Sequence, residues 1–302
     1  MRTNFSWFKI LESPIPMQER RLTDAKNLTP AALPGESRLL VTLATYNERD
    51  NLARLVAEIH SYLPRADVLV IDDNSPDGTG AVADQLAAAD RRVRVLHRPG
   101  KLGLGTALQA AMAYAIEHDY DLMINMDADF SHPPRYLPAI LAGMDRYDIM
   151  IGSRYVRGGA TENWPLPRRL ISCCVNLLVR TLLRMPVRDA SGAYRCYRVA
   201  RLRTTDLNNL LSRGYSFQQE ILFRCYKAGC TMGETPILFE NRRAGSSKVN
   251  AREAIRSMSV LLWLGIRNFF GLEGPRYVEP KPNPNSKPNL TTNPNSKPNP
   301  QC

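Results

Sequence analysis

Short apolar runs alternate with helical stretches through the middle of the chain, and this alternation constrains the fold more than any other feature. The runs with the length and apolar character of buried strands are residues 39–43, 68–71, 93–96, 122–124 and 149–151. The stretches with helical character are residues 51–63, 80–89 and 105–118. Strands that alternate with helices predict an α/β fold, with a mostly parallel open sheet and helices on both faces, as in Rossmann-like proteins.

Polar residues follow four of these expected strands. They occupy residues 44–48, 72–78, 127–129 and 152–154. In an open sheet of parallel strands, ligands bind at the carboxyl ends of the strands. The sequence therefore predicts that these four segments gather at one edge of the sheet and form a binding site there.

Asp127 and Asp129 are the most informative pair among these polar residues. Residues two apart on a strand point to the same side, so both carboxylates can face one site. Two hard oxygen donors suit Mg²⁺ or Mn²⁺, and such an ion can hold a diphosphate. An acidic loop without a ligand is the alternative interpretation, and this short pattern alone does not decide between the two.

A second acidic segment favours a nucleotide ligand. Asp73 ends a strand and is expected to accept hydrogen bonds from a ribose or a base, whereas Asn74 suits a turn. Tyr46 and Glu48 follow the first strand, where they can stack on and hydrogen-bond the same nucleotide. Glu48 has an equal alternative as the cap of the helix that follows it.

The glycines of residues 101–106 do not indicate a dinucleotide-binding loop. Leu108 stands where the third glycine of that motif belongs, and the segment follows the third expected strand instead of the first. These glycines predict a tight turn into a helix, and a nicotinamide-dependent dehydrogenase is disfavoured.

The charge of the chain limits its partners. The 302 residues carry a formal net charge of +11, most of it from arginine, which suits a phosphorylated substrate, an anionic membrane surface or a nucleic acid. A nucleic-acid-binding or catalytically silent protein is disfavoured, because carboxylates cluster at the expected site. The six cysteines lack metal-ligand spacing and are too few for a disulfide scaffold, which predicts reduced thiols in the cytoplasm.

The strand-end segments, taken together, resemble a known family. The matching motifs lie at residues 44–48, 70–79, 126–134 and 152–159, and further matches lie at 162–165, 189–192, 214–220 and 242–248. They closely resemble the inverting family 2 glycosyltransferases, and within that family the polyprenol-phosphate (dolichol-phosphate) mannose synthases. The resemblance runs in order over roughly residues 38–250.

The resemblance implies a GT-A fold, GDP-mannose as donor, a polyprenyl (dolichyl) monophosphate as acceptor and Mg²⁺ or Mn²⁺ as cofactor. It implies nucleoside contacts from Tyr46, Glu48, Ile71 and Asp73. It implies metal and diphosphate contacts from Asp127, Ala128 and Asp129, and donor phosphate contacts from Arg154, Arg242 and Lys248. Arg168 matches a basic residue near the acceptor phosphate. Among these residues, Asp129, Arg154 and Lys248 are the expected catalytic ones.

Two positions depart from the family pattern. Ala44, in the substrate-binding segment, stands where the family usually has proline, so the stiffness of that loop can differ. Ser131 stands where some members carry a metal-binding glutamine, and a hydroxyl or a water would have to take its place in the metal site. A polyprenyl-phosphate glucosyltransferase that uses a UDP-sugar is the alternative within the same fold.

The expected organisation has four parts: a flexible leader (1–36), the GT-A catalytic domain (37–250), an amphipathic helix (251–274) and a disordered Asn/Pro/Lys repeat tail (275–302). A helix over residues 167–185 carries arginines on one side and apolar residues on the other. It can lie on a membrane surface or pack on the sheet. We expect peripheral attachment to the cytosolic face of a membrane (endoplasmic reticulum or bacterial inner membrane), with or without a membrane-anchored subunit.

Overall fold

The computed structural model describes residues 37–207, 210, 216–240 and 251–272, and for 251–257 only the backbone. The expectations for the leader (1–36) and the tail (275–302), and those for Arg242 and Lys248, fall outside the described residues.

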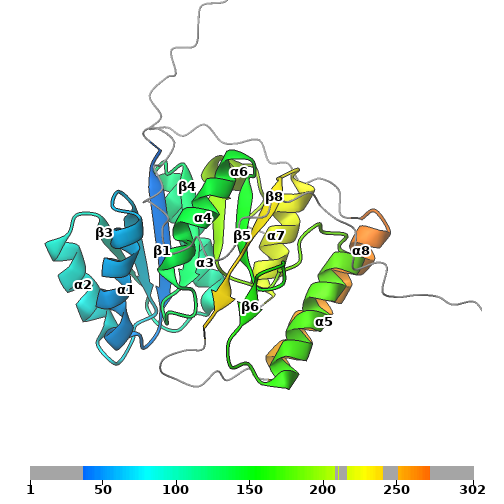
Figure 1. Cartoon of the computed structure of the whole chain (residues 1–302), viewed down its shortest axis with the longest axis horizontal. Coiled ribbons are helices and arrows are strands. Elements are labelled where there is room, and N and C mark those ends of the chain that lie inside the picture. The colour runs from blue at the N-terminus through cyan, green and yellow to red at the C-terminus, as the bar shows by residue number, and fades with distance from the viewer. Residues whose placement is uncertain (1–36, 208–209, 211–215, 241–250, 273–302) are drawn as a thin grey trace, which may run out of the picture.

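A seven-stranded sheet forms the centre of the protein (Figure 1). Its strands, in spatial order, are β3 (Val93–His97), β2 (Asp67–Asp72), β1 (Leu39–Thr45), β4 (Leu122–Asp127), β7 (Arg195–Arg198), β5 (Ile149–Ser153) and β8 (Met232–Pro236). Only β7 runs antiparallel to its neighbours within this sheet. A short second sheet pairs β6 (Ala160–Thr161) with β9 (Leu238–Phe239). The predicted mostly parallel α/β architecture is confirmed.

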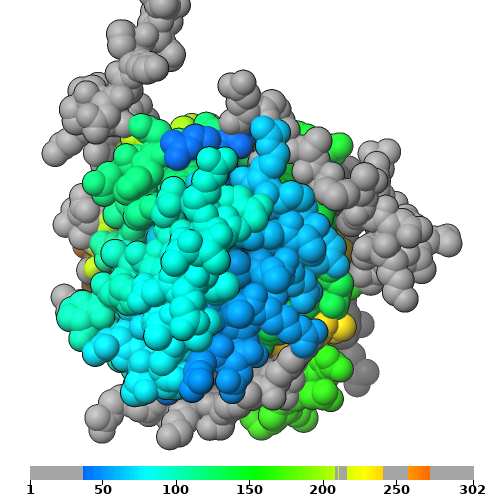
Figure 2. Space-filling view, turned by 90° about the vertical axis from the view of Figure 1, so that its left-hand side faces the viewer, coloured from blue at the N-terminus to red at the C-terminus, as the bar shows by residue number. Residues whose placement is uncertain are grey.

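Helices cover both faces of the large sheet. One face packs against α1 (Arg49–Tyr62), α2 (Thr79–Ala89) and α4 (Leu137–Ala142), with the 3₁₀ turns at Pro134–Tyr136 and Gly143–Asp145 beside α4. The other face packs against α3 (Leu104–Glu117), α6 (Val199–Arg203) and α7 (Phe217–Lys227). Figure 2 looks onto the α2 side, where blue and cyan residues of the first half of the chain form the surface.

The strand sequences explain why the sheet is sandwiched. In β1, Leu40 packs into one apolar cluster while Leu39, Val41 and Leu43 pack into the other. Successive side chains of a strand point to opposite faces, so a continuous apolar run requires cover on both sides. That requirement leaves the polar strand ends as the part of the sheet open to a ligand.

Helices α5 (Leu166–Leu182) and α8 (Ala251–Phe269) lie side by side at the margin of this sandwich (Figure 1), and Val179, Leu261 and Leu264 join them to its core. Gly265 makes their close approach possible, because a Cβ atom there would lie 2.8 Å from Cβ of Leu182. Val179 of α5 is buried in the core on that face of the sheet, whereas Leu170, Ile171 and Leu177 of the same helix are exposed. The exposed large apolar residues of the pair are Leu166, Leu170, Ile171, Leu177, Leu262, Trp263, Ile266 and Phe269. No described helix combines the length and the apolarity that crossing a membrane requires.

Candidate functional site

The polar strand ends meet at one edge of the sheet, as the sequence predicts. Ala44 near the end of β1 is paired with Ile71 of β2 on one side and with Asp127 of β4 on the other. The register thus places three of the expected ligand-contact positions in one row. Asp73 follows directly, because its backbone N–H donates to the carbonyl of Thr45 at 3.2 Å.

The loop after β4 holds its two carboxylates in a defined arrangement. Asp129 is buried, and its Oδ1 accepts hydrogen bonds from the backbone N–H of Ser131 at 3.0 Å and from the Ser131 hydroxyl at 2.5 Å. Asp127 keeps about a quarter of its side chain exposed. Phe130, between Asp129 and Ser131, adopts a left-handed conformation with φ of 64°. Ser131 therefore orients Asp129, whether or not it also contacts an ion.

His132 holds this loop through a hydrogen bond to its backbone. The backbone N–H of Asp127 donates to His132 Nδ1 at 3.0 Å, so Nδ1 carries no proton. Burial lowers the pKa of His132, which keeps the ring neutral near pH 7 despite the neighbouring carboxylates. No sequence pattern singles out this histidine, since the four histidines of the chain are scattered.

The donor set fits a hard divalent cation. Asp127 and Asp129 supply carboxylate oxygens, and no group of three or more His, Cys, Asp or Glu side chains converges within the described residues. Mg²⁺ is commonly held by one or two carboxylates together with waters and substrate phosphates. An ion at this loop would therefore leave positions for a diphosphate.

At the far end of the row, Asp73 is engaged by a residue that the sequence analysis missed. Arg98 donates from Nε to Asp73 Oδ1 at 2.6 Å and from a terminal nitrogen to Oδ2 at 2.9 Å. The backbone N–H of Leu102 also donates to Oδ2 at 3.2 Å. Arg98 comes directly after β3, and that strand-end position was the available signal. Asp73 and the loop beyond β3 thus form one unit.

Tyr46 lies beside this unit with about a third of its surface exposed. The Lys101 ammonium lies 4.1 Å from the centre of its ring. Asn74 has φ of 56°, the left-handed conformation that suits the expected turn. Glu48 precedes α1, but its side chain makes no capping hydrogen bond to the helix backbone. Its carboxylate accepts from the Asn51 side chain at 2.8 Å.

Arg154, after β5, forms a buried ion pair with Asp189. Its Nε and terminal nitrogen donate to the two carboxylate oxygens at 2.7 and 2.6 Å, and its backbone N–H donates to Oδ2 at 3.0 Å. Burial alone would raise the pKa of Asp189, but the Arg154 charge and hydrogen bonds outweigh it and hold that pKa below its ordinary value. Asp189 therefore fixes the direction of the Arg154 side chain.

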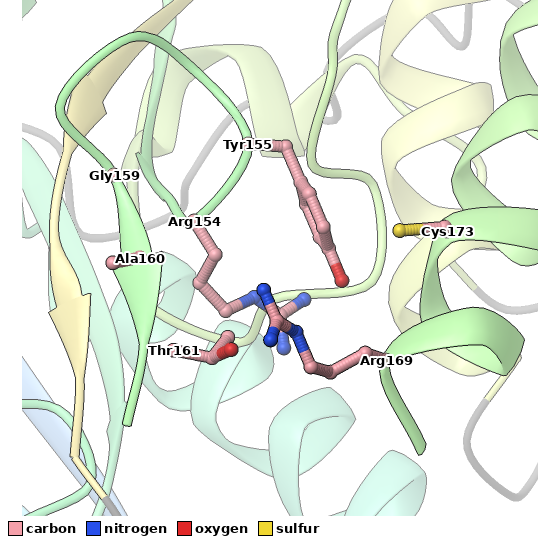
Figure 3. Close-up of a pocket in the computed structure, with 7 residues that line it drawn as sticks. All are labelled: Arg154, Tyr155, Gly159, Ala160, Thr161, Arg169 and Cys173. Carbon is pink, nitrogen blue, oxygen red and sulfur yellow. The ribbon is translucent and has the colours of Figure 1, made fainter. Parts of the chain in front are cut away.

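A cavity of about 290 Å³ opens between the segment after β5 and helix α5 (Figure 3). Arg154 and Arg169 enter it from opposite sides, and Thr161 also lines it. Tyr155 and Cys173 complete the lining on the side of α5. Two arginines that line one cavity make it suitable for a phosphate. The neighbouring Arg168 lies instead on Trp164, with its Cζ 4.0 Å from the centre of the ring.

The chain reaches the undescribed segment 241–250 from the same site. The backbone N–H of Glu240 donates to the carbonyl of Ser131 at 3.2 Å, and its carboxylate accepts from Arg135 at 2.8 Å. The residue two positions before Arg242 is thus held against the loop that carries Asp127 and Asp129.

Comparison with known proteins is consistent with this geometry. Residues 41–210, more than half of the chain, match the model of glycosyl transferase family 2. The chain belongs to this family. As a family 2 glycosyltransferase it is an enzyme, and the resemblance found in the sequence is confirmed.

Two curated relatives are similar along most of their length. The polyprenol monophosphomannose synthase of Mycolicibacterium smegmatis is 41% identical over 240 residues, which cover 79% of this chain and 91% of the relative. The undecaprenyl-phosphate mannosyltransferase of Micrococcus luteus is 40% identical over 242 residues, which cover 78% and 100%.

Solved structures of more distant proteins share the fold. Mannosyl-3-phosphoglycerate synthase from Rubrobacter xylanophilus aligns with a TM-score of 0.60 at 15% identity, over 83% of this chain and 82% of that one. Glucosyl-3-phosphoglycerate synthase from Mycobacterium tuberculosis, in complex with Mn²⁺, UDP and phosphoglyceric acid, aligns with a TM-score of 0.55 at 15% identity, over 75% and 78%. These likenesses confirm the expected glycosyltransferase architecture.

Proposed function

We propose that this family 2 glycosyltransferase transfers mannose from GDP-mannose to a polyprenyl monophosphate, with inversion at the anomeric carbon. The observation that carries the proposal is the arginine-lined cavity beyond β5, set at the same sheet edge as the acidic loop after β4. The cavity can receive an acceptor phosphate, and the acidic loop can receive a donor diphosphate. The curated relatives, named for mannose transfer to polyprenyl phosphates, support this reading over nearly their whole length.

The donor site follows from the row of strand ends. The nucleoside lies against Tyr46, Glu48, Ile71 and Asp73, and the diphosphate lies at the acidic loop 127–129 beside Ala44. Asp127 and Asp129 hold Mg²⁺ or Mn²⁺, with Ser131 as a further oxygen donor. The ion, when bound, neutralises charge that builds on the departing diphosphate. The resemblance adds Arg242 and Lys248 as further contacts to that diphosphate.

The acceptor site follows from the cavity. A phosphate monoester has a second pKa of about 6, so its oxygen is already anionic near neutral pH and needs no strong base. That oxygen forms a bond to the anomeric carbon of mannose as the bond from this carbon to GDP breaks. Arg168 and Arg169 hold the acceptor phosphate at this end. Arg154, which the resemblance assigns to the donor phosphate, lines the same cavity, and Asp189 keeps it in place between the two phosphates.

An activity assay tests the proposal directly. Purified protein is incubated with GDP-mannose or UDP-glucose, a divalent metal and a polyprenyl phosphate, and the lipid-linked sugar is identified by mass spectrometry. We expect mannosyl phosphoryl lipid and GDP, with a β configuration at the anomeric carbon. Glucosyl lipid formed from UDP-glucose in its place would contradict the donor, and transfer to neither lipid would contradict the reaction.

The exposed apolar side of the α5 and α8 pair supports peripheral attachment to the cytosolic face of a membrane. Arg169 and the arginine-lined cavity lie next to this side, so a lipid carrier held in the bilayer can present its phosphate to the cavity. The arginines suit anionic head groups, and attachment can also involve a membrane-anchored subunit.

Serine at Leu170, Leu177, Ile266 and Phe269 should weaken binding to vesicles of anionic phospholipid at least tenfold. Each of these side chains is more than half exposed, and burial of a large apolar side chain contributes about 1.5–3 kcal/mol. Flotation of the protein with vesicles measures the effect. Serine at the equally exposed Leu102, which lies away from this pair of helices, should leave vesicle binding unchanged. If both variants float with the vesicles as well as the unaltered protein does, the exposed apolar residues of α5 and α8 do not mediate membrane binding.

A further inference from the structure

We infer that Trp164 is a positioning residue for the acceptor phosphate, through the stacking of Arg168 on its ring. This inference rests on the proposed function and adds a residue to its acceptor site. It is carried by a row of ring contacts that joins Arg168 to the loop of Asp127 and Asp129.

The row of ring contacts begins at His132, beside the acidic loop. His132, which accepts the Asp127 backbone N–H, stacks on Tyr194 with ring centres 4.9 Å apart. It also contacts Phe239 edge to face at 5.3 Å. Phe239 belongs to β9 and lies one residue before Glu240, which is bound to the Ser131 carbonyl. These contacts fix Phe239 relative to the acidic loop.

Trp164 continues the row toward the acceptor end. Its ring meets Phe239 edge to face at 5.3 Å. The Arg168 guanidinium carbon lies 4.0 Å from the ring centre and that of Arg154 lies 5.2 Å from it. One aromatic ring therefore contacts two arginines that the proposed function assigns to phosphate, and its own position is set by the loop at the donor end.

The contacts of Trp164 explain why an aromatic ring is needed there. Its indole N–H is buried and has no hydrogen-bond acceptor among the residues that the structure describes, so an internal hydrogen bond does not account for the tryptophan. Arg168 is partly exposed at the start of α5, where a long side chain samples many rotamers. A π face attracts a guanidinium group and limits that sampling. Arg168 is thereby held ready before the phosphate arrives.

The test compares Trp164→Leu with Trp164→Phe in the full-length protein, with GDP-mannose, Mn²⁺ and a short-chain polyprenyl phosphate in detergent. Leucine removes the π face, whereas phenylalanine retains one. We expect leucine to raise KM for the acceptor about tenfold while KM for GDP-mannose stays within about twofold. Phenylalanine should keep the acceptor KM within about threefold of the unaltered protein.

Two further variants separate positioning from folding. Tyr120→Leu removes another ring that contacts an arginine, with the guanidinium carbon of Arg38 4.6 Å from the ring centre at the opposite edge of the sheet. Tyr120 is buried and its hydroxyl donates to Asp67, so this variant also reports the effect of lost stability, and it should leave the ratio of the two KM values unchanged. Arg168→Leu should raise the acceptor KM by itself, and adding Trp164→Leu should then have little further effect, because the ring acts through that arginine.

Several results would overturn the inference. They are an unchanged acceptor KM in Trp164→Leu, an equal rise of both KM values, equal damage from phenylalanine and leucine, and full additivity with Arg168→Leu. If Trp164→Leu does not fold, the other two variants still test the inference. The acceptor KM of Trp164→Phe must stay near that of the unaltered protein, and the acceptor KM of Arg168→Leu must rise. If the proposed function itself is wrong, the unaltered protein transfers no mannose to the lipid. That result is different from each of those that overturn the role of Trp164.

Discussion

Asp129→Ala should lower turnover by about a hundredfold to a thousandfold, and Asp129→Asn should lower it nearly as far. Asp129 lies two residues after Asp127, with which β4 ends at the row formed by β2, β1 and β4. Removing a group that stabilises developing charge costs roughly 10²–10³ in rate. Asparagine retains an oxygen that can accept from Ser131, so the loop keeps its hydrogen bonds. Initial rates over a titration of Mn²⁺ and of Mg²⁺ measure the loss.

The control for this experiment is Asp119→Asn. Asp119 lies at the opposite edge of the sheet, is ion-paired with Arg203 and has φ of 53°, a conformation that asparagine tolerates well. It should retain normal rates and normal metal dependence. If Asp129→Asn retained its activity at every metal concentration, the assigned role of this carboxylate would be wrong.

The second large effect is expected on stability, from Asp189→Asn. Asp189 is fully buried and receives hydrogen bonds from Arg154 and from the backbone of Gly192. Removing one partner of a buried ion pair leaves an uncompensated charge and costs about 3–5 kcal/mol in the free energy of unfolding. Urea denaturation followed by circular dichroism measures that free energy, and the activity should fall as Arg154 loses its fixed direction.

Asp90→Asn provides the comparison. Asp90 pairs with Arg92 near the surface, with about a quarter of its side chain exposed, and its loss should cost less than about 1 kcal/mol. A loss as large as that of Asp189→Asn would show that burial does not govern these two pairs. A loss below about 1 kcal/mol for Asp189→Asn would show that Arg154 does not need its partner.

The pH dependence of unfolding gives an independent check on the same pair. The pKa of Asp189 is lowered in the folded protein, so its charge stabilises the fold above its ordinary pKa of about 3.9. That contribution is lost as the pH falls through the lowered value. Asp189→Asn should therefore reduce stability at neutral pH more than at the acid end, and flatten the acid limb of the curve.

Much of the donor site could be predicted because it depends on local sequence and simple topology. An apolar strand followed by Asp127 and Asp129 is visible in the sequence, and parallel strands bring their carboxyl ends together. Strand pairing then places Ala44 between Ile71 and Asp127. The roles in catalysis of these residues remain predictions.

The acceptor end could not be derived in the same way. Arg154 and Asp189 are 35 residues apart, and neither has a local pattern that announces a buried pair. Cavity formation depends on where α5 lies relative to the segment after β5, which brings in Arg169 where the resemblance had indicated Arg168. The sequence alone did not decide which apolar residues of α5 are exposed, because the amphipathic pattern of a helix on lipid is the same as that of a helix on a sheet.

The sequence by itself determined the α/β alternation and the edge of the sheet at which the polar strand ends and their carboxylates meet. Strand periodicity is local, and alternation of strands with helices makes the strands parallel, so that their carboxyl ends share one edge even when they are distant in sequence. Only the tertiary structure decided which arginines share a cavity, that Arg98 engages Asp73, and that Trp164 contacts both Arg168 and Phe239. These contacts bring together residues from distant segments, and their geometry exists only once the helices have packed on the sheet.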